Sequence, residues 1–334
     1  MYRLLRPLLF QLDPETAHDL TLRVLRLSSQ LPLTNYFLHR LFIVNDPRLE
    51  VEAFGIRFKN PVGLAAGYDK NGIAVKGLSA LGFGHIEVGT ITRLPQAGNP
   101  RPRVHRVTSS QAIINSMGFP NNGVESLKVE RGAARVGVNI GKGKDTPLER
   151  AAEDYCELFK RVHAAADYVT INISSPNTLN LRQLQARATL EELLRAVTQT
   201  RNVLTPRLPL LIKIAPDLSE REMDDVIAAT ESCGLDGIIA TNTTVSRDET
   251  PPAAKNLIGG LSGVPLRARS TEVIRYLAAH TQLPIVGVGG ITCAADALEK
   301  IGAGARLIQI YTGLIYSGPG LVRQINQDIL RKFH

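Results

Sequence analysis

The spacing of apolar and polar positions changes at about residue 46 of the 334-residue chain. Before that point leucines recur at helical spacing, and Asp13 and Pro14 then supply a helix cap and a first helical position. The pattern predicts two helices, the second ending at about Ser28, and a third short helical turn after Pro32. We therefore expect an amphipathic helical extension over residues 1–45.

From residue 46 to 334, a predicted hairpin around Gly55 is followed by short apolar runs that alternate with amphipathic segments. The expected strands are 62–66, 85–89, 136–140, 168–173, 210–214, 237–240, 285–288 and 307–311. Alternation of β and α predicts a parallel sheet, and eight units predict an α/β fold of the (β/α)8 TIM-barrel type. An open doubly wound sheet is the alternative. The chain has no Gly-x-Gly-x-x-Gly turn after its first strand, which disfavours the dinucleotide-binding form of that alternative.

A barrel places functional side chains in the loops that follow its strands. In this chain those positions carry amides, hydroxyls, lysines and glycines. They are Ala66, Gly67, Tyr68, Asp69, Lys70, Thr90, Asn139, Asn172, Lys213, Thr241, Asn242, Thr243, Gly289, Gly290, Tyr311 and Thr312.

The densest group of polar side chains follows the fourth expected strand, at residues 172–178. Pro176 cannot continue a ladder, so the chain turns out of the sheet there. Carboxamides both donate and accept, so Asn172 and Asn177 can fix a planar polar ligand, and Ser175 between them can take a proton. A polar turn with no catalytic role is the alternative.

Glycine-rich segments at the seventh and eighth strands point to a phosphate. Gly289 and Gly290 follow strand seven, while Gly302 and Gly304 precede strand eight. Barrels often bind phosphate there, because glycine lets backbone N–H groups approach the anion. The segment 259–263 is expected to be a further flexible loop.

The segment between the second and third strands, 91–135, exceeds an ordinary loop. Its polar part carries Met117 and Phe119. We expect it to cover a small ligand from one side, with a purely structural cap as the alternative.

Composition limits the cellular compartment and the kinds of partner that the chain can have. The three cysteines show no paired spacing, which argues against a disulfide framework or a zinc site and for a reducing compartment. No apolar run reaches roughly 18 residues, so no membrane span is predicted. The net charge of +8 fits nucleic acid, anionic lipid or an acidic substrate. The basic helical extension can lie on a membrane, or it can be a helical pair packed on the barrel.

Several motifs occur in one order and together resemble the dihydroorotate dehydrogenase family over nearly the whole chain. They are 66–72 (Ala-Gly-Tyr-Asp-Lys-Asn-Gly), 87–92 (Glu-Val-Gly-Thr-Ile-Thr), 115–119 (Asn-Ser-Met-Gly-Phe), 172–178 (Asn-Ile-Ser-Ser-Pro-Asn-Thr), 212–217 (Ile-Lys-Ile-Ala-Pro-Asp), 241–243 (Thr-Asn-Thr) and 259–263 (Gly-Gly-Leu-Ser-Gly). The serine at 175 and the helical extension resemble the membrane-associated, quinone-reducing class, because the soluble classes usually have cysteine as the base.

The resemblance implies oxidation of (S)-dihydroorotate to orotate in pyrimidine biosynthesis, with FMN as cofactor, a quinone as electron acceptor and no metal. It implies Ser175 as the catalytic base, and His18 and Arg106 as quinone contacts. The implied FMN contacts are Ala66, Gly67, Tyr68, Asp69, Lys70, Thr90, Asn139, Asn172, Lys213, Thr241, Gly263, Gly290, Tyr311 and Thr312. The implied substrate contacts are Lys70, Asn115, Ser116, Met117, Gly118, Phe119, Asn172, Asn177, Asn242 and Thr243.

Chemistry adds roles to these residues. Lys213 is expected to offset negative charge on the reduced flavin, and Lys70 to pair with the substrate carboxylate. A serine is a poor base unaided, and Thr178 is the nearest polarising neighbour in sequence. Tyr68 departs from the small aliphatic residues also familiar in the family, and only its backbone is expected to contact the cofactor.

The expected setting is the cytoplasmic side of the cell membrane, as a peripheral protein on anionic lipid, without nucleic acid, and as a monomer or weak dimer. One alternative is a tRNA-modifying FMN reductase on a similar barrel, but the chain shows neither an acid cysteine in the site nor a nucleic-acid-binding extension. A non-catalytic flavin- or phosphate-binding barrel is the other. It gives no reason for Ser175 to stand between two asparagines.

Overall fold

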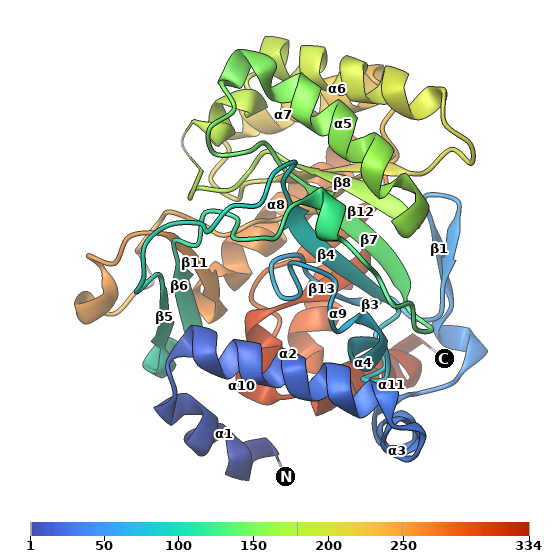
Figure 1. Cartoon of the computed structure of the whole chain (residues 1–334), viewed down its shortest axis with the longest axis vertical. Coiled ribbons are helices and arrows are strands. Elements are labelled where there is room, and N and C mark those ends of the chain that lie inside the picture. The colour runs from blue at the N-terminus through green and yellow to red at the C-terminus, as the bar shows by residue number, and fades with distance from the viewer. Residues whose placement is uncertain (1, 179, 249, 334) are drawn as a thin grey trace.

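At the centre of the chain is a closed barrel of eight parallel strands, seen in a computed structural model that describes residues 2–178, 180–248 and 250–333 (Figure 1). In barrel order the strands are β3 (Val62–Leu64), β4 (His85–Ile91), β7 (Arg135–Ile140), β8 (Tyr168–Asn172), β9 (Leu210–Ile214), β10 (Gly237–Ala240), β12 (Ile285–Val288) and β13 (Ala305–Ile310). Pairing of β13 with β3 closes the ring. The predicted TIM barrel is confirmed, and every expected strand lies within a few residues of an observed one.

Helices cover the outside of the barrel. They are α4 (Val75–Ser79), α5 (Ala151–Val162), α6 (Arg187–Asn202), α7 (Glu220–Ser232), α8 (Arg267–His280), α9 (Ala294–Gly302), α10 (Thr312–Ser317) and α11 (Gly320–Phe333). In α5, Tyr155, Leu158, Phe159 and Val162 are buried at helical spacing, which seats one face of the helix on the sheet. A capping box between Ser219 and Glu222 starts α7. Short 3₁₀ turns join the elements: η1 (Pro47–Leu49), η2 (Thr108–Ser110), η3 (Val124–Ser126), η4 (Leu148–Arg150), η5 (His163–Ala165), η6 (Leu181–Gln185), η7 (Pro252–Ala254) and η8 (Val264–Leu266).

The predicted hairpin, β1 (Val51–Ala53) and β2 (Ile56–Phe58), packs at the N-terminal end of the barrel. Phe58 is fully buried there and meets the ring of His85, the first residue of β4. The hairpin therefore closes one end of the barrel and leaves the other end for ligands.

A second, three-stranded antiparallel sheet stands beside that open end and consists of β5 (Val104–Val107), β6 (Ala112–Asn115) and β11 (Gly260–Gly263). The prediction of a flexible loop at 259–263 was wrong, because Gly260–Gly263 pairs residue by residue with β6. The long 91–135 segment supplies the other two strands. Figure 1 shows this sheet as a separate small layer beside the barrel.

The N-terminal extension forms three helices, α1 (Tyr2–Gln11), α2 (Pro14–Gln30) and α3 (Pro32–Phe42). Asp13 caps α2 as predicted, accepting from the backbone N–H groups of Glu15 and Thr16. The third element is a helix of 11 residues rather than the short turn expected. A Cβ added at Gly77 of α4 would lie 2.2 Å from the Leu25 carbonyl oxygen, so α2 approaches α4 at backbone distance.

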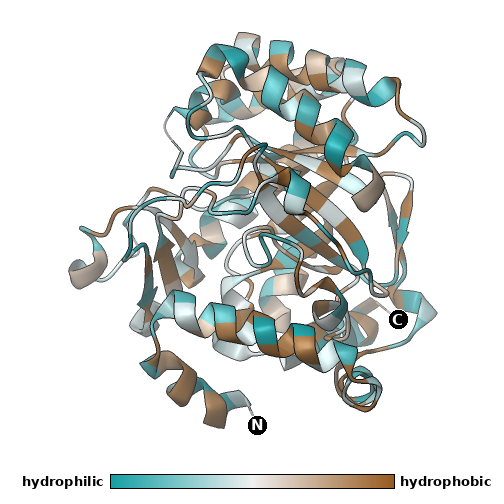
Figure 2. Cartoon of the chain, viewed as in Figure 1, coloured by the Kyte–Doolittle hydropathy of each residue, from teal (hydrophilic) through white to brown (hydrophobic). Residues whose placement is uncertain are grey.

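Figure 2 shows many apolar residues along α1 and α2, and large apolar side chains such as Leu4, Leu27 and Phe37 are exposed on the three helices. In the part of the chain that the structure describes, no helix combines the length and apolar character needed to cross a bilayer. The boundary between the extension and the barrel at residue 45 stays a prediction.

Candidate active site

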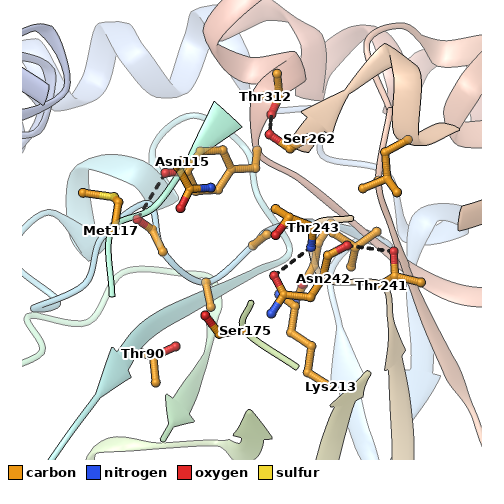
Figure 3. Close-up of a pocket in the computed structure, with 18 of the residues that line it drawn as sticks. Thr90, Asn115, Met117, Ser175, Lys213, Thr241, Asn242, Thr243, Ser262 and Thr312 are labelled. Atoms are coloured by element: carbon orange, nitrogen blue, oxygen red, sulfur yellow. Dashed lines mark hydrogen bonds between the residues drawn. The ribbon is translucent and has the colours of Figure 1, made fainter. Parts of the chain in front are cut away.

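A cavity of about 140 Å³ lies at the C-terminal ends of the barrel strands (Figure 3). Every barrel strand except β7 contributes residues to it, directly or through the loop that follows. The predicted residues that line it are Ala66, Gly67, Lys70, Thr90, Asn115, Met117, Gly118, Phe119, Asn172, Ser175, Asn177, Lys213, Thr241, Asn242, Thr243, Gly263, Gly289, Gly290, Tyr311 and Thr312. The fold thus brings most of the predicted site together.

Four predicted residues lie outside the lining of this cavity. The Asp69 carboxylate accepts from the backbone N–H groups of Ile73 and Ala74, so it holds the loop after β3. Asn139 accepts from the Thr90 hydroxyl at 2.6 Å and lies behind it. The backbone N–H of Ser116 donates to the Arg103 carbonyl. Tyr68 lines a second cavity.

The phosphate prediction was wrong for Gly302 and Gly304. These two glycines precede β13 and so lie at the opposite end of the barrel, where Gly304 packs against Ala278. Gly289 and Gly290, which follow β12, do reach the cavity.

Some lining residues were not predicted: Ala65, Pro120, Ser262, Leu266, Val288, Ile291, Gln309, Ile310 and Gly313. Gln309 carried a usable signal, because it is an amide between two isoleucines in the buried part of its strand. Ser262, whose hydroxyl lies 2.8 Å from that of Thr312, is brought there by the pairing of β11 with β6. Local sequence gave no sign of that pairing.

The loop after β8 presents one of its two serines to the cavity. Ser174 donates from its hydroxyl and its backbone N–H to the Asn172 carboxamide oxygen, and its hydroxyl accepts from Asn242. Ser175 faces the cavity instead, and its oxygen accepts from the backbone N–H of Asn177 at 3.3 Å. Thr178 is buried, and its hydroxyl finds no hydrogen-bond partner among the described residues, so the expected contact with Ser175 is absent.

Carboxamides and hydroxyls hold one another in fixed orientations beside Ser175. Asn172 donates to the Thr90 hydroxyl at 2.9 Å and to the Asn139 oxygen at 3.1 Å, while its own oxygen accepts from Asn242 at 3.4 Å. On the far side, Asn177 donates to the backbone and side-chain oxygens of Asn115. The amides are therefore preorganised for a planar ligand with several donors and acceptors.

Two lysines bring positive charge to the cavity. Lys213 is almost fully buried, and burial lowers its pKa although the carboxylate of Glu87 acts in the opposite direction. Burial also lowers the pKa of Lys70 to about 8, against the attraction of Glu15 and Asp19. No described residue makes a hydrogen bond with either ammonium group, so both are available to an anionic or electron-rich ligand.

A cluster of glycines lines the cavity beside β12 and β13. A Cβ at Gly263 would lie 2.3 Å from the Gln111 carbonyl oxygen, and one at Gly290 would lie 2.4 Å from the Cβ of Arg267. Both have positive φ, +98° and +72°, which side-chain-bearing residues rarely adopt. Only glycine fits at these positions, and the exposed backbone can approach a phosphate closely.

A larger cavity of about 820 Å³ opens between the N-terminal helices and the barrel. Leu5, Leu9, Leu22 and Leu25 are among its apolar walls. Its lining shares five residues with the first cavity: Lys70, Asn115, Met117, Pro120 and Tyr311. The two cavities therefore meet at a common wall.

Both predicted quinone contacts line this second cavity. Burial, together with the charge of Lys70, lowers the pKa of His18 to about 3, so its imidazole is neutral. The guanidinium of Arg106 donates to the carbonyls of Leu9 and Leu12 and lies 4.7 Å from the ring centre of Phe10. Arg106 thus ties α1 to β5.

Residues 48–333 match the family model described as dihydroorotate dehydrogenase. The chain belongs to the dihydroorotate dehydrogenase family. The resemblance seen in the sequence motifs is confirmed.

Relatives named dihydroorotate dehydrogenase (quinone) are similar along the whole chain. The protein from Roseiflexus sp. (strain RS-1) is 48% identical over 99% of this chain and 94% of its own length. That from Chromobacterium violaceum is 50% identical over 96% and 95%. Among solved structures, the dihydroorotate dehydrogenase of Eimeria tenella in complex with ferulenol has a TM-score of 0.88 at 37% identity, covering 97% of this chain and 94% of that one. The match to the Roseiflexus protein covers 99% of this chain and therefore includes the N-terminal helices as well as the barrel.

Proposed function

We propose that the protein oxidises (S)-dihydroorotate to orotate and passes the electrons through FMN to a quinone, as a step of pyrimidine biosynthesis. The observation that carries this proposal is the common wall between a polar cavity and a larger apolar one. A small charged substrate fits the first cavity and a long apolar acceptor fits the second. The names of the relatives support the same pair of substrates.

The residues of the first cavity suit FMN. The glycine backbone at Gly263, Gly289 and Gly290 would hold the phosphate, with the hydroxyl of Thr312 beside it. Lys213 would face the ring system, where its charge stabilises added negative charge. When bound, FMN would supply the acceptor for the hydride that leaves the substrate.

Ser175 is the proposed base that removes a proton from the substrate ring. The backbone N–H of Asn177 donates to its oxygen, which favours the deprotonated form of the hydroxyl during transfer. Lys70 would pair with the substrate carboxylate, and Asn172 and Asn242 would hold the amide groups of the ring. Preorganisation of these amides by the Thr90–Asn139 network reduces the orientational cost of reaction.

The N-terminal helices are proposed to admit the quinone and to attach the protein to the cytoplasmic face of the membrane. Large apolar side chains are exposed on all three helices: Leu4, Leu8, Leu20, Leu27, Leu33, Tyr36 and Phe37. Arg23 and Arg26 are exposed on α2 and can attract anionic lipid, each by about 1 kcal/mol when close to the surface. We still predict that the protein is a monomer or weak dimer and that it does not bind nucleic acid.

The test is an anaerobic titration of the purified, FMN-loaded protein with dihydroorotate. Bleaching of the yellow flavin with one equivalent of orotate formed, followed by recovery of the colour on adding decylubiquinone, is the expected result. A loaded protein that dihydroorotate does not bleach would contradict the first half of the proposal. Bleaching without recovery would contradict the quinone half.

A further inference from the structure

Tyr68 lines the second cavity and packs against Tyr311, one of the residues that both cavities share. Its ring makes edge-on contacts with His18, at 4.8 Å between ring centres, and with Tyr311, at 5.5 Å. Two such contacts from different directions fix the plane of the ring. The side chain therefore has a defined place, beyond the backbone contact expected from the sequence.

Among the described residues, the hydroxyl of Tyr68 has no hydrogen-bond partner, and it is not one of the fully buried side-chain oxygens that lack a partner. It is open to the cavity. The other tyrosines on that cavity's described wall differ, because Tyr311 donates to the Gly67 carbonyl at 3.3 Å and Tyr2 to the Ile315 carbonyl. A buried phenol usually finds an acceptor. Here a ligand in the cavity can supply it.

Two other polar groups near this end of the cavity are already engaged. The His18 ring lies beside the backbone of Tyr68, a polar contact that acts to raise its pKa against the larger effect of burial. Arg106 donates to two carbonyls of the α1 end. Lys70 faces both cavities and is assigned to the substrate carboxylate. Tyr68 is left as a neutral, uncommitted donor at the inner end.

We propose that the Tyr68 hydroxyl donates a hydrogen bond to a carbonyl oxygen of the quinone head and so helps to determine which acceptors the protein uses, an inference that rests on the proposed quinone function. Quinone carbonyls only accept hydrogen bonds, and their oxygens gain negative charge as the ring is reduced. A fixed donor at that position stabilises the charge as it develops. Burial, helped by Tyr311, Tyr2 and Asp69, raises the pKa of Tyr68 above its usual value, so the donor stays protonated across the physiological range.

The experiment compares wild type with Tyr68→Phe in the full-length, FMN-loaded protein. Loss of one neutral hydrogen bond should raise the KM for decylubiquinone about three- to tenfold. The rate constant for flavin reduction by dihydroorotate, measured by anaerobic stopped flow, should change less than twofold, because the aromatic ring and its packing remain. Tyr276→Phe is the matched control: its hydroxyl binds Asp224 on the outer surface, away from both cavities, and its quinone KM should equal that of wild type.

A second measurement separates donation from packing. The infrared band of ¹³C-carbonyl-labelled decylubiquinone bound to the oxidised protein should lie at lower frequency in wild type than in Tyr68→Phe. A raised KM with an unchanged band would make Tyr68 a packing residue and overturn the inference, as would an unchanged KM with an unchanged band. If wild type itself fails to reduce decylubiquinone, the proposed function fails instead.

Discussion

The buried ion pair between Glu15 of α2 and Arg103, next to β5, fastens the helical extension to the barrel. Arg103 donates to both carboxylate oxygens of Glu15, through Nε at 3.1 Å and Nη2 at 3.0 Å, and its remaining nitrogen donates to the Ala97 and Asn99 carbonyls. The side chains are only 7% and 10% exposed. Glu15→Ala would leave a buried guanidinium without its counter-charge.

The magnitude follows from that burial. Breaking one partner of a buried pair costs about 3–5 kcal/mol, and the two carbonyls that stay with Arg103 place this pair near the lower end. Since about 1.4 kcal/mol is a factor of ten, the population in which α2 is detached should rise on the order of 100-fold. The barrel strands contribute nothing to this pair, so their local stability should hold.

Hydrogen exchange resolved by peptide measures this directly. In Glu15→Ala, amides of α2 should exchange about 100-fold faster, while amides of β8 and β9 keep wild-type protection. Arg150→Ala is the control, because its pair with Glu153 is more than half exposed and is worth under about 1 kcal/mol. Protection of α2 within about threefold of wild type would refute the view that this pair holds the helix.

Other expected outcomes concern the chemistry. Ser175→Ala should keep FMN but slow flavin reduction by about 10²–10⁴-fold in stopped flow, and a rate within tenfold of wild type would exclude Ser175 as the base. Lys213→Ala should weaken FMN retention or lower the flavin reduction potential, and a fully loaded variant with an unchanged potential would contradict this. The pKa of Lys70 near 8 means that its charge is present below that pH and lost above it, so the KM for dihydroorotate should climb as pH rises from 7 to 9; a flat profile would remove Lys70 from carboxylate binding. A chain starting at Asn45 should still bleach with dihydroorotate but lose turnover with long-tailed quinones, and unchanged quinone kinetics would contradict the tunnel.

The barrel was predictable because its strands are buried on both faces and therefore read as short apolar runs at regular spacing. The polar residues that follow these apolar runs all lie at the C-terminal end of the barrel, and most of them line the cavity. Sequence position alone does not distinguish a residue that lines the cavity from one directly behind it. Asn139, for example, ends one layer short of the cavity and supports Thr90 from behind.

Two features were beyond the sequence for physical reasons. The strand Gly260–Gly263 has two glycines among its four residues, which do not favour a strand by themselves, and its partner Ala112–Asn115 is remote in the chain. The glycines at 302 and 304 look as suitable for phosphate as those at 289 and 290. Only the direction of the strands distinguishes the two pairs, because it places Gly302 and Gly304 at the closed end of the barrel.

The second cavity has a consequence for how the acceptor is supplied. Leu5, Val24 and Leu41 line that cavity and are also about half exposed at the surface, so its outer end lies among apolar side chains. An acceptor that enters there from a bilayer is drawn from a two-dimensional phase, and occupancy follows its mole fraction in lipid rather than its concentration in buffer. Adding vesicles that contain no quinone would then slow a membrane-bound protein by surface dilution, although nothing in the protein or in the total amount of quinone has changed.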